Sequence, residues 1–230
     1  NGGDLLNGSR SYDARRWVVV SAPVLLMESF ALIMMNFDIL VLEFFVEPDQ
    51  IAIYFAAIRT ISLVAFVQFA VSASIMSRFA SAHARQDANA LGHLLSAARK
   101  WTFVPSAIGL AMLLAVGKPI LWLFGPAFVS GYPVMFSLAV GILARAAAGP
   151  AQGLLVVTGR QNISAGVMVA AVVLNAALNL TLIPHFGLLG AAAATASAFV
   201  LEALILSIVA NQVTAQPNPD GTIADDTPAE

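Results

Sequence analysis

Charge and cysteine are both scarce in this sequence. Of its 230 residues only 10% are charged, and cysteine does not occur at all. A soluble domain carries about 25% charged residues, so this composition argues against a soluble globular protein. The absence of cysteine excludes disulfides and thiolate metal ligands from any account of the fold. No secretory signal peptide is visible. Because the first residue is Asn1, we expect the sequence to be a piece of a longer protein.

Apolar side chains make up most of the rest, at 59% of residues, and the mean hydropathy is +0.84. They gather in six runs, each near or above the ~20 residues that a helix needs to cross a bilayer. No alternation of short apolar and polar segments indicates barrel strands. The sequence therefore predicts an all-α, polytopic membrane protein with six transmembrane helices. The runs are 17–45, 51–76, 101–124, 133–157, 165–183 and 188–210.

Basic residues are concentrated on one side of the predicted bundle. Because successive spans cross in opposite directions, eight Lys or Arg residues fall on that side, and Lys118 alone falls on the other. Cytoplasmic loops of membrane proteins carry an excess of Lys and Arg, so we expect both termini in the cytoplasm. The eight residues are Arg10, Arg15, Arg16, Arg78, Arg85, Arg99, Lys100 and Arg160.

Three segments flank or interrupt the six-span bundle, which we expect over 17–211. Residues 1–16 are predicted to form a cytoplasmic segment before the first span. Residues 77–100 are rich in Ala and Leu and predict an amphipathic cytoplasmic helix on the inner leaflet, with a solvated linker helix as the plainer alternative. Residues 212–230 are acidic and rich in Pro, Asp and Thr, which predicts a disordered cytoplasmic tail.

Five ionisable residues lie well inside the predicted spans, away from their ends. At the bilayer centre each costs about 2.5–3.5 kcal/mol on insertion scales, so such groups face a bundle interior or a wet cavity and usually pair. Arg145 has two interpretations: paired with an acid it is structural, and unpaired it lines a path for an anionic substrate. The five residues are Glu28, Asp38, Arg59, Arg145 and Glu202.

Asp38 and Arg59 are predicted to lie at one depth in the membrane. The turn between the first two runs centres near Pro48, and each residue lies about ten positions from that centre, or ~15 Å of helix. If their faces agree, the two side chains pair. One interpretation is a purely structural ion pair. The other is a titratable or cation-binding carboxylate in a water-filled cavity.

Uncharged polar residues in the last two runs fall at the same level. Asn175 and Asn179 are spaced i and i+4 on one helical face, and Thr195 follows the PHFG turn that separates the two runs. With Asp38 they supply a carboxylate, two amide oxygens and a hydroxyl, the oxygen ligands that hard cations such as Na+ prefer. The alternative is ordinary hydrogen bonding that holds packed membrane helices together.

Several stretches, in order along the chain, resemble the oligosaccharide flippase group of the multidrug/oligosaccharidyl-lipid/polysaccharide exporter superfamily. The run NAALNLTLIPHFGLLGAAAATASA resembles the penultimate and last helices of that group. FDILVL together with YFAAIRTISLV resembles its seventh and eighth helices. PILWLFGPAFVSGYPV and GLLVVTGRQN resemble its ninth-to-tenth and tenth-to-eleventh connections. The resemblance covers about residues 15–213.

The resemblance implies that the chain is the second of two six-helix lobes in a transporter of twelve to fourteen helices. The lobes of such transporters face each other across a central cavity, so the N-terminal six-helix lobe is expected as a missing partner. The implied function is the flipping of lipid-linked oligosaccharide by alternating access. An example is O-antigen units on undecaprenyl pyrophosphate, which cross the bacterial inner membrane.

The resemblance also implies roles for particular residues. Related lipid II flippases hold a sodium ion with an acid on the seventh helix, polar residues four apart on the eleventh and a threonine on the twelfth. Asp38, Asn175, Asn179 and Thr195 match that layout in position. Asn179 stands where those proteins have a second carboxylate, which removes a negative charge from the site.

The family's cationic cavity implies that Arg59 and Arg145 contact the pyrophosphate. Two other functions stay open: a cation-coupled multidrug exporter of the same superfamily, and a non-transporting membrane protein that assembles or scaffolds a partner. No glycine-rich phosphate loop, metal-ligand cluster or Ser/His/Asp set appears in the sequence. We therefore expect no enzymatic activity, no cofactor beyond Na+ or H+ for coupling, and no nucleic-acid partner.

Overall fold

The computed structural model describes residues 36–215, and all regular elements in that part of the chain are helical. This confirms the all-α prediction. The chain divides into two compact units, Asn1–Phe37 and Asp38–Glu230, and the contacts described below belong to the second. The elements are α2 (Phe37–Leu42), α3 (Pro48–Ser62), α4 (Ala65–Ala84), α5 (Ala88–Ala115), α6 (Gly117–Leu123), the 3-10 helix η1 (Pro126–Gly131), α7 (Tyr132–Ala148), α8 (Ala151–Val157) and α9 (Gln161–Ala215).

Three stretches of the described residues are long and apolar enough to cross a membrane: Pro48–Ala84, Pro126–Ala148 and Gln161–Ala215. A fourth is added if α5 and α6, which are bent by 61° at their junction, count as one broken span. These helices indicate a membrane protein, in agreement with the composition.

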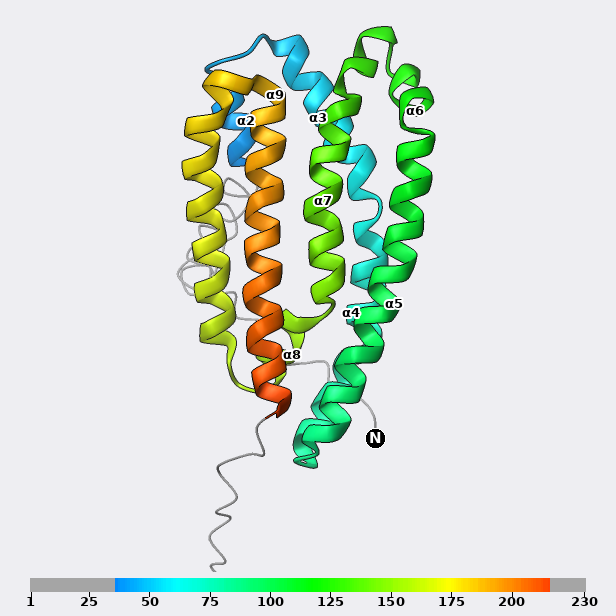
Figure 1. Cartoon of the computed structure of the whole chain (residues 1–230), viewed down its shortest axis with the longest axis vertical. Coiled ribbons are helices and arrows are strands. Elements are labelled where there is room, and N and C mark those ends of the chain that lie inside the picture. Colours follow the sequence, from blue (N-terminus) through cyan, green and yellow to red (C-terminus); the bar gives the residue numbers. More distant parts are fainter. Residues whose placement is uncertain (1–35, 216–230) are drawn as a thin grey trace, which may run out of the picture. The chain divides into compact units, whose positions relative to one another are not determined.

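α9 consists of two helical arms that meet at Gly187. The φ and ψ angles of Gly187 are 53° and −127°, a conformation that is readily open to glycine alone. Figure 1 shows the yellow first arm and the orange second arm running side by side in opposite directions from this turn. The apolar runs 165–183 and 188–210 therefore fall on different arms of one hairpin.

Two other apolar runs are interrupted within the described part of the chain. Run 101–124 contains the bend between α5 and α6. Run 133–157 is broken after α7, where Gly149 has a φ of 62° and Pro150 precedes α8. A glycine at positive φ followed by a proline ends a helix whatever the hydropathy of its neighbours, so an apolar run does not guarantee one continuous helix. Most of the first run, 17–45, lies outside the described residues.

The prediction of a separate helix over 77–100 is wrong. α4 continues to Ala84, a short turn follows, and α5 begins at Ala88. Gln86 in this turn has a φ of 55°, and the Asp87 carboxylate accepts a hydrogen bond of 2.8 Å from the Ala90 amide. This N-cap starts α5 at a point where the Ala-rich composition gave no sign of a break.

The tail prediction needs a smaller correction. Helix α9 extends to Ala215, so residues 212–215 are helical rather than disordered. The remainder of the predicted tail and the predicted N-terminal segment 1–16 both lie outside the described residues.

Small side chains form much of the contact between α7 and α9. Ala191, Ala192 and Ala194 of the second arm are completely buried. A Cβ atom on Gly141 of α7 would come 2.8 Å from the Cα atom of Ala196, which is too close for any side chain. The backbones of the two helices can therefore approach closely, as in other membrane bundles.

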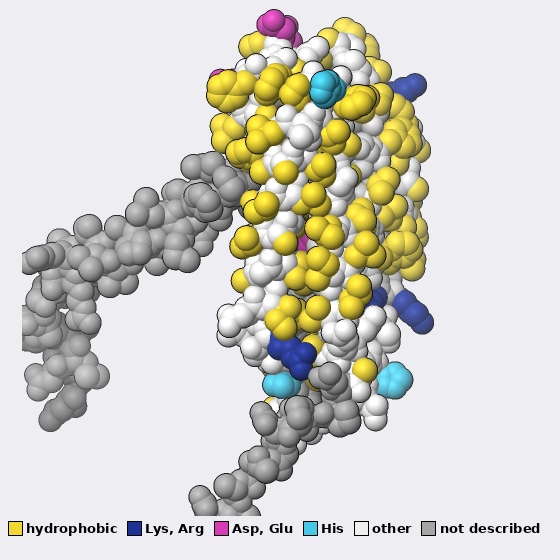
Figure 2. Space-filling view, turned by 60° about the vertical axis from the view of Figure 1, so that its left-hand side comes forward, with side chains coloured by type: hydrophobic (Ala, Val, Ile, Leu, Met, Phe, Trp, Pro, Cys, Tyr) yellow, Lys and Arg dark blue, Asp and Glu magenta, His cyan; other side chains and the backbone are white. Residues whose placement is uncertain are grey.

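Large apolar side chains face outward. Phe44, Leu123 and Phe69 are 83%, 78% and 73% exposed, respectively. Figure 2 shows hydrophobic side chains across the visible face, with Lys, Arg and His side chains toward its upper and lower ends. Small residues at the contact between α7 and α9, with large apolar residues on the outside, are the arrangement expected where lipid takes the place of water as the solvent.

Candidate functional site

Asp38 is the buried carboxylate of the described bundle. It lies in the first turn of α2, and 5% of its surface is exposed. Its Oδ2 atom accepts a hydrogen bond of 2.6 Å from the Tyr54 hydroxyl, and its Oδ1 atom accepts one of 2.9 Å from the Ile39 amide. Tyr54 comes from α3 and is fully buried. Both hydrogen bonds stabilise the carboxylate, whose burial among apolar side chains would otherwise cost free energy.

The contacts continue from Tyr54 into α9. The Thr195 hydroxyl, on the second arm, lies near the Tyr54 hydroxyl. The Asn175 side-chain amide, on the first arm, donates to the Thr195 hydroxyl over 3.2 Å. The Asn179 amide donates to the Asn175 Oδ1 atom over 2.9 Å. We call these five residues the polar network, which joins α2, α3 and both arms of α9.

The network ends at an oxygen atom without a partner. Asn179 is fully buried, and its Oδ1 atom accepts no hydrogen bond within the described part of the chain. A buried acceptor left unsatisfied costs ~1–3 kcal/mol, and such atoms in native structures often mark a place for a missing ligand. If the predicted cation binds to the network, the Asn179 oxygen is the buried acceptor that remains for it to contact.

The local sequence explains why these groups meet. The i, i+4 spacing places Asn175 and Asn179 on one face of the first arm. The turn at Gly187 then brings the second arm alongside, and Gly190 of that arm packs directly against the Leu182 backbone of the first arm. A side chain at Gly190 would clash with the Leu182 backbone and push the two arms apart near the turn.

The structure therefore gathers four of the six sequence-predicted site residues in one place. Asp38, Asn175, Asn179 and Thr195 belong to the same network, although whether it binds a cation stays a prediction.

Arg59 is not part of this network. Its side chain is exposed, and its guanidinium carbon lies 4.7 Å from the centre of the Phe55 ring. The partner of Asp38 is instead Tyr54, five positions earlier, which is about 140° around the helix from Arg59. One helix cannot present both faces to the same carboxylate, so the interpretation of an Asp38–Arg59 ion pair is wrong. An ion pair requires equal depth in the membrane, and it also requires that the two side chains lie on helix faces that point toward each other.

Arg145 lies elsewhere in the bundle and is paired. Its Nε atom lies 3.6 Å from the Glu202 Oε2 atom, and its guanidinium carbon lies 4.6 Å from the centre of the Phe199 ring. The two side chains of the ion pair are 36% and 13% exposed, so the pair is reachable from outside rather than sealed in the core. Of the two interpretations of Arg145, the structure supports pairing. Glu28, the other acid considered as a partner, lies outside the described residues.

Tyr54 is the member of the network that the sequence analysis missed. A search for charged partners overlooks a tyrosine because the phenol ring counts as apolar in a hydropathy profile. The available signal was that a buried tyrosine hydroxyl nearly always requires a partner, and that Tyr54 is the only tyrosine in the second apolar run.

Comparisons of the chain with protein-family models, with curated proteins and with solved structures found no match. The geometry above and the sequence resemblance are therefore the basis for any assignment of function.

The bond between Tyr54 and Asp38 predicts an energetic coupling. Tyr54→Phe removes a donor to a buried carboxylate and should lower the free energy of unfolding by ~1.5–3 kcal/mol. In an Asp38→Asn background the same substitution should cost clearly less, because the charge is gone. The measurement is a double-mutant cycle by SDS-induced unfolding of the purified protein in mixed micelles.

Tyr132→Phe provides the matched control for this cycle. The Tyr132 hydroxyl donates to the Leu114 carbonyl oxygen over 2.8 Å, so this variant loses a hydrogen bond to a neutral acceptor. Its effect should be smaller than that of Tyr54→Phe and should not depend on Asp38. Equal losses from Tyr54→Phe with and without the Asp38 carboxylate would contradict the described contact.

Proposed function

We propose that this chain is one lobe of a membrane transporter that flips lipid-linked oligosaccharide by alternating access, coupled to a cation. The observation that carries the proposal is the polar network, because it places an acid and an unpartnered amide oxygen inside an otherwise apolar bundle. Ionisable residues at such positions in membrane proteins usually mark ion or substrate pathways. The ordered motifs that resemble the oligosaccharide flippase group support the same assignment.

The network has the properties of a coupling site for one small cation. Asp38 supplies the negative charge, and the Asn179 Oδ1 atom offers an oxygen that no donor occupies. Because α2, α3 and both arms of α9 contribute, a bound cation would favour one arrangement of these segments over another. A ligand shifts a conformational equilibrium only through such a difference in affinity between two states. This is the link that cation-coupled alternating access requires.

The proposal includes a six-span topology. The two arms of α9 would each cross the bilayer, with α3–α4, α5–α6 and α7–α8 as three further crossings. The run 17–45 would supply the sixth. The lobe would lie in the bacterial inner membrane with both termini in the cytoplasm and would face a second six-helix lobe across the substrate path.

The two arginines are proposed to contact the pyrophosphate of the substrate. Arg59 is exposed and makes no ion pair with another described residue, so its guanidinium group is available. Arg145 would exchange its 3.6 Å contact with Glu202 for a charge-assisted bond to phosphate oxygens. Glu202 would then hold Arg145 in position between transport cycles.

The Arg145–Glu202 pair also favours a second candidate, a cation-coupled exporter of cationic drugs. A neutralised arginine leaves the substrate path less positive, and Phe199 beside it offers an aromatic surface. A cationic drug would be attracted by Glu202, whereas a pyrophosphate would be attracted by Arg145. Substitutions at these two positions therefore separate the two functions.

Removal of the Asp38 charge tests the cation site. In Asp38→Asn the rise in melting temperature on addition of sodium chloride should shrink strongly, since stabilisation by a ligand follows its affinity for the folded state. The measurement is thermal unfolding of the full-length transporter in sodium chloride against choline chloride at equal ionic strength. Asp49→Asn is the control, because Asp49 is exposed at the start of α3. An undiminished sodium response in Asp38→Asn would reject the ion site.

Complementation tests the proposed substrate. Arg145→Ala in the full-length gene should abolish surface polysaccharide in a flippase-deficient strain, whereas Glu202→Gln should retain it at least in part. Lys118→Ala, a substitution of a cation distant from the proposed path, is the control. If Glu202→Gln abolishes function as completely as Arg145→Ala, the pair is structural. Normal polysaccharide in Arg145→Ala would remove this residue from the substrate path.

A further inference from the structure

A groove of about 480 Å³ lies between the end of α4 and the start of α5, outside the polar network. On α4 the lining residues Arg78, Ser81, Ala82 and Arg85 are spaced i, i+3, i+4 and i+7, which places them on one face. At the start of α5 the N-cap Asp87, Ala90 and Leu94 are spaced i, i+3 and i+7, again on one face. The groove is therefore built by two helix faces that the turn between α4 and α5 brings together. Ser77 and His93 complete the lining.

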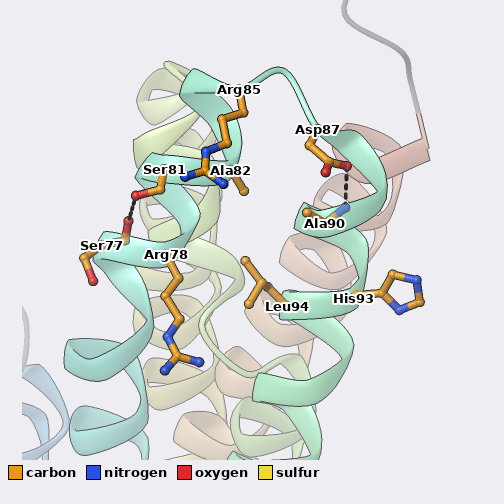
Figure 3. Close-up of a pocket in the computed structure, with 9 residues that line it drawn as sticks. All are labelled: Ser77, Arg78, Ser81, Ala82, Arg85, Asp87, Ala90, His93 and Leu94. Atoms are coloured by element: carbon orange, nitrogen blue, oxygen red, sulfur yellow. Dashed lines mark hydrogen bonds between the residues drawn. The ribbon is translucent and has the colours of Figure 1, made fainter.

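The charge of this groove is unbalanced. The guanidinium groups of Arg78 and Arg85 are exposed, and neither forms a hydrogen bond or ion pair with another residue of the described part of the chain. Asp87 is the one acid among the lining residues, and its Oδ1 atom is already used as the N-cap of α5. Figure 3 shows both arginine side chains extending from the α4 side and Leu94 projecting from α5 toward them, while His93 points away.

The position of the groove indicates which kind of anion it would bind. α4 is the last part of the membrane-crossing stretch Pro48–Ala84, so the groove opens at one end of an apolar helix. Its lining is apolar at Ala82 and Leu94 and cationic at the two arginines. Trp101 follows Leu94 by two helical turns on the same face of α5, about 10 Å away along the axis, and is 71% exposed. Exposed tryptophan is typical of the membrane–water boundary.

We infer that this groove binds a phosphate group at the membrane surface, and that the phosphate belongs to the headgroup of an anionic phospholipid. Guanidinium groups form paired, charge-assisted hydrogen bonds with phosphate oxygens. Basic grooves between helices at a membrane surface have the chemistry that anionic headgroups require. The acyl chains would follow the apolar surface of α4 and α5 toward Trp101. This inference does not depend on the proposed transport function.

The test compares lipid retention by the purified full-length protein in neutral detergent. Phosphatidylglycerol and phosphatidylcholine are added in equal amounts, and bound lipid is counted by native mass spectrometry. The wild-type protein should retain phosphatidylglycerol preferentially. Arg78→Gln/Arg85→Gln should weaken that binding roughly ten- to thirty-fold, in line with the usual contribution of two basic residues near a membrane surface. Because both arginines are exposed, the melting temperature should stay close to that of the wild type.

Lys100→Gln/Lys118→Gln is the charge-matched control, because it removes two exposed cations that do not line the groove. It should retain phosphatidylglycerol as the wild type does, and millimolar inorganic phosphate should not displace the lipid. Equal retention by the arginine variant and the wild type would overturn the inference. So would equal losses in the two double variants. Complete displacement by inorganic phosphate would overturn the assignment to lipid and indicate a soluble phosphate ligand.

Discussion

A carboxylate buried among apolar helices has to find its hydrogen-bond donors within the protein. Asp38 finds them in the Tyr54 hydroxyl and the Ile39 amide, at 2.6 and 2.9 Å. The first of these bonds connects α2 to α3. Tyr54 in turn lies beside Thr195 of α9. Removing one partner leaves a buried polar group unsatisfied. This costs more free energy than the hydrogen bond contributes to stability. The relative positions of four helical segments therefore depend on this one charge.

The polar network and the Arg145–Glu202 pair occupy separate places in the bundle. The polar network contains one carboxylate and ends in an acceptor that has no donor among the described residues, the arrangement on which the proposed cation site rests. The Arg145–Glu202 pair is internally balanced and partly open to its surroundings. A cation-coupled transporter of the proposed kind would use both kinds of site: one for the coupling ion and one that exchanges contacts with its cargo. In the proposed lobe the second arm of α9 connects them, since it carries both Thr195 and Glu202, seven positions and about two turns apart.

Much of the architecture followed from apolar runs and turn residues, and so did part of the site. Hydropathy predicted the helical class, and the depth of each residue relative to the nearest turn brought Asn175 and Thr195 to one level, where they are hydrogen-bonded. Arg59 was misplaced because depth fixes only the height of a residue, whereas its face depends on the rotation of the helix. The breaks at Gly149 and Gln86 depend on backbone conformations that hydropathy does not register. Tyr54 was missed because its ring counts as apolar in a hydropathy profile, so its hydroxyl group gives no signal there.

The claim on which the account depends is that Asn175 and Thr195 face each other inside the α9 hairpin. The chain has no cysteine, so introduced thiols can be studied without a background. The most direct measurement is cross-linking of Asn175→Cys/Thr195→Cys in membranes with a short bifunctional reagent that fluoresces only when both ends have reacted. The account predicts strong fluorescence for this pair and little for Val173→Cys/Thr195→Cys, since Val173 is 62% exposed on another face of the first arm. Equal fluorescence from the two pairs, or none from the first, would contradict it.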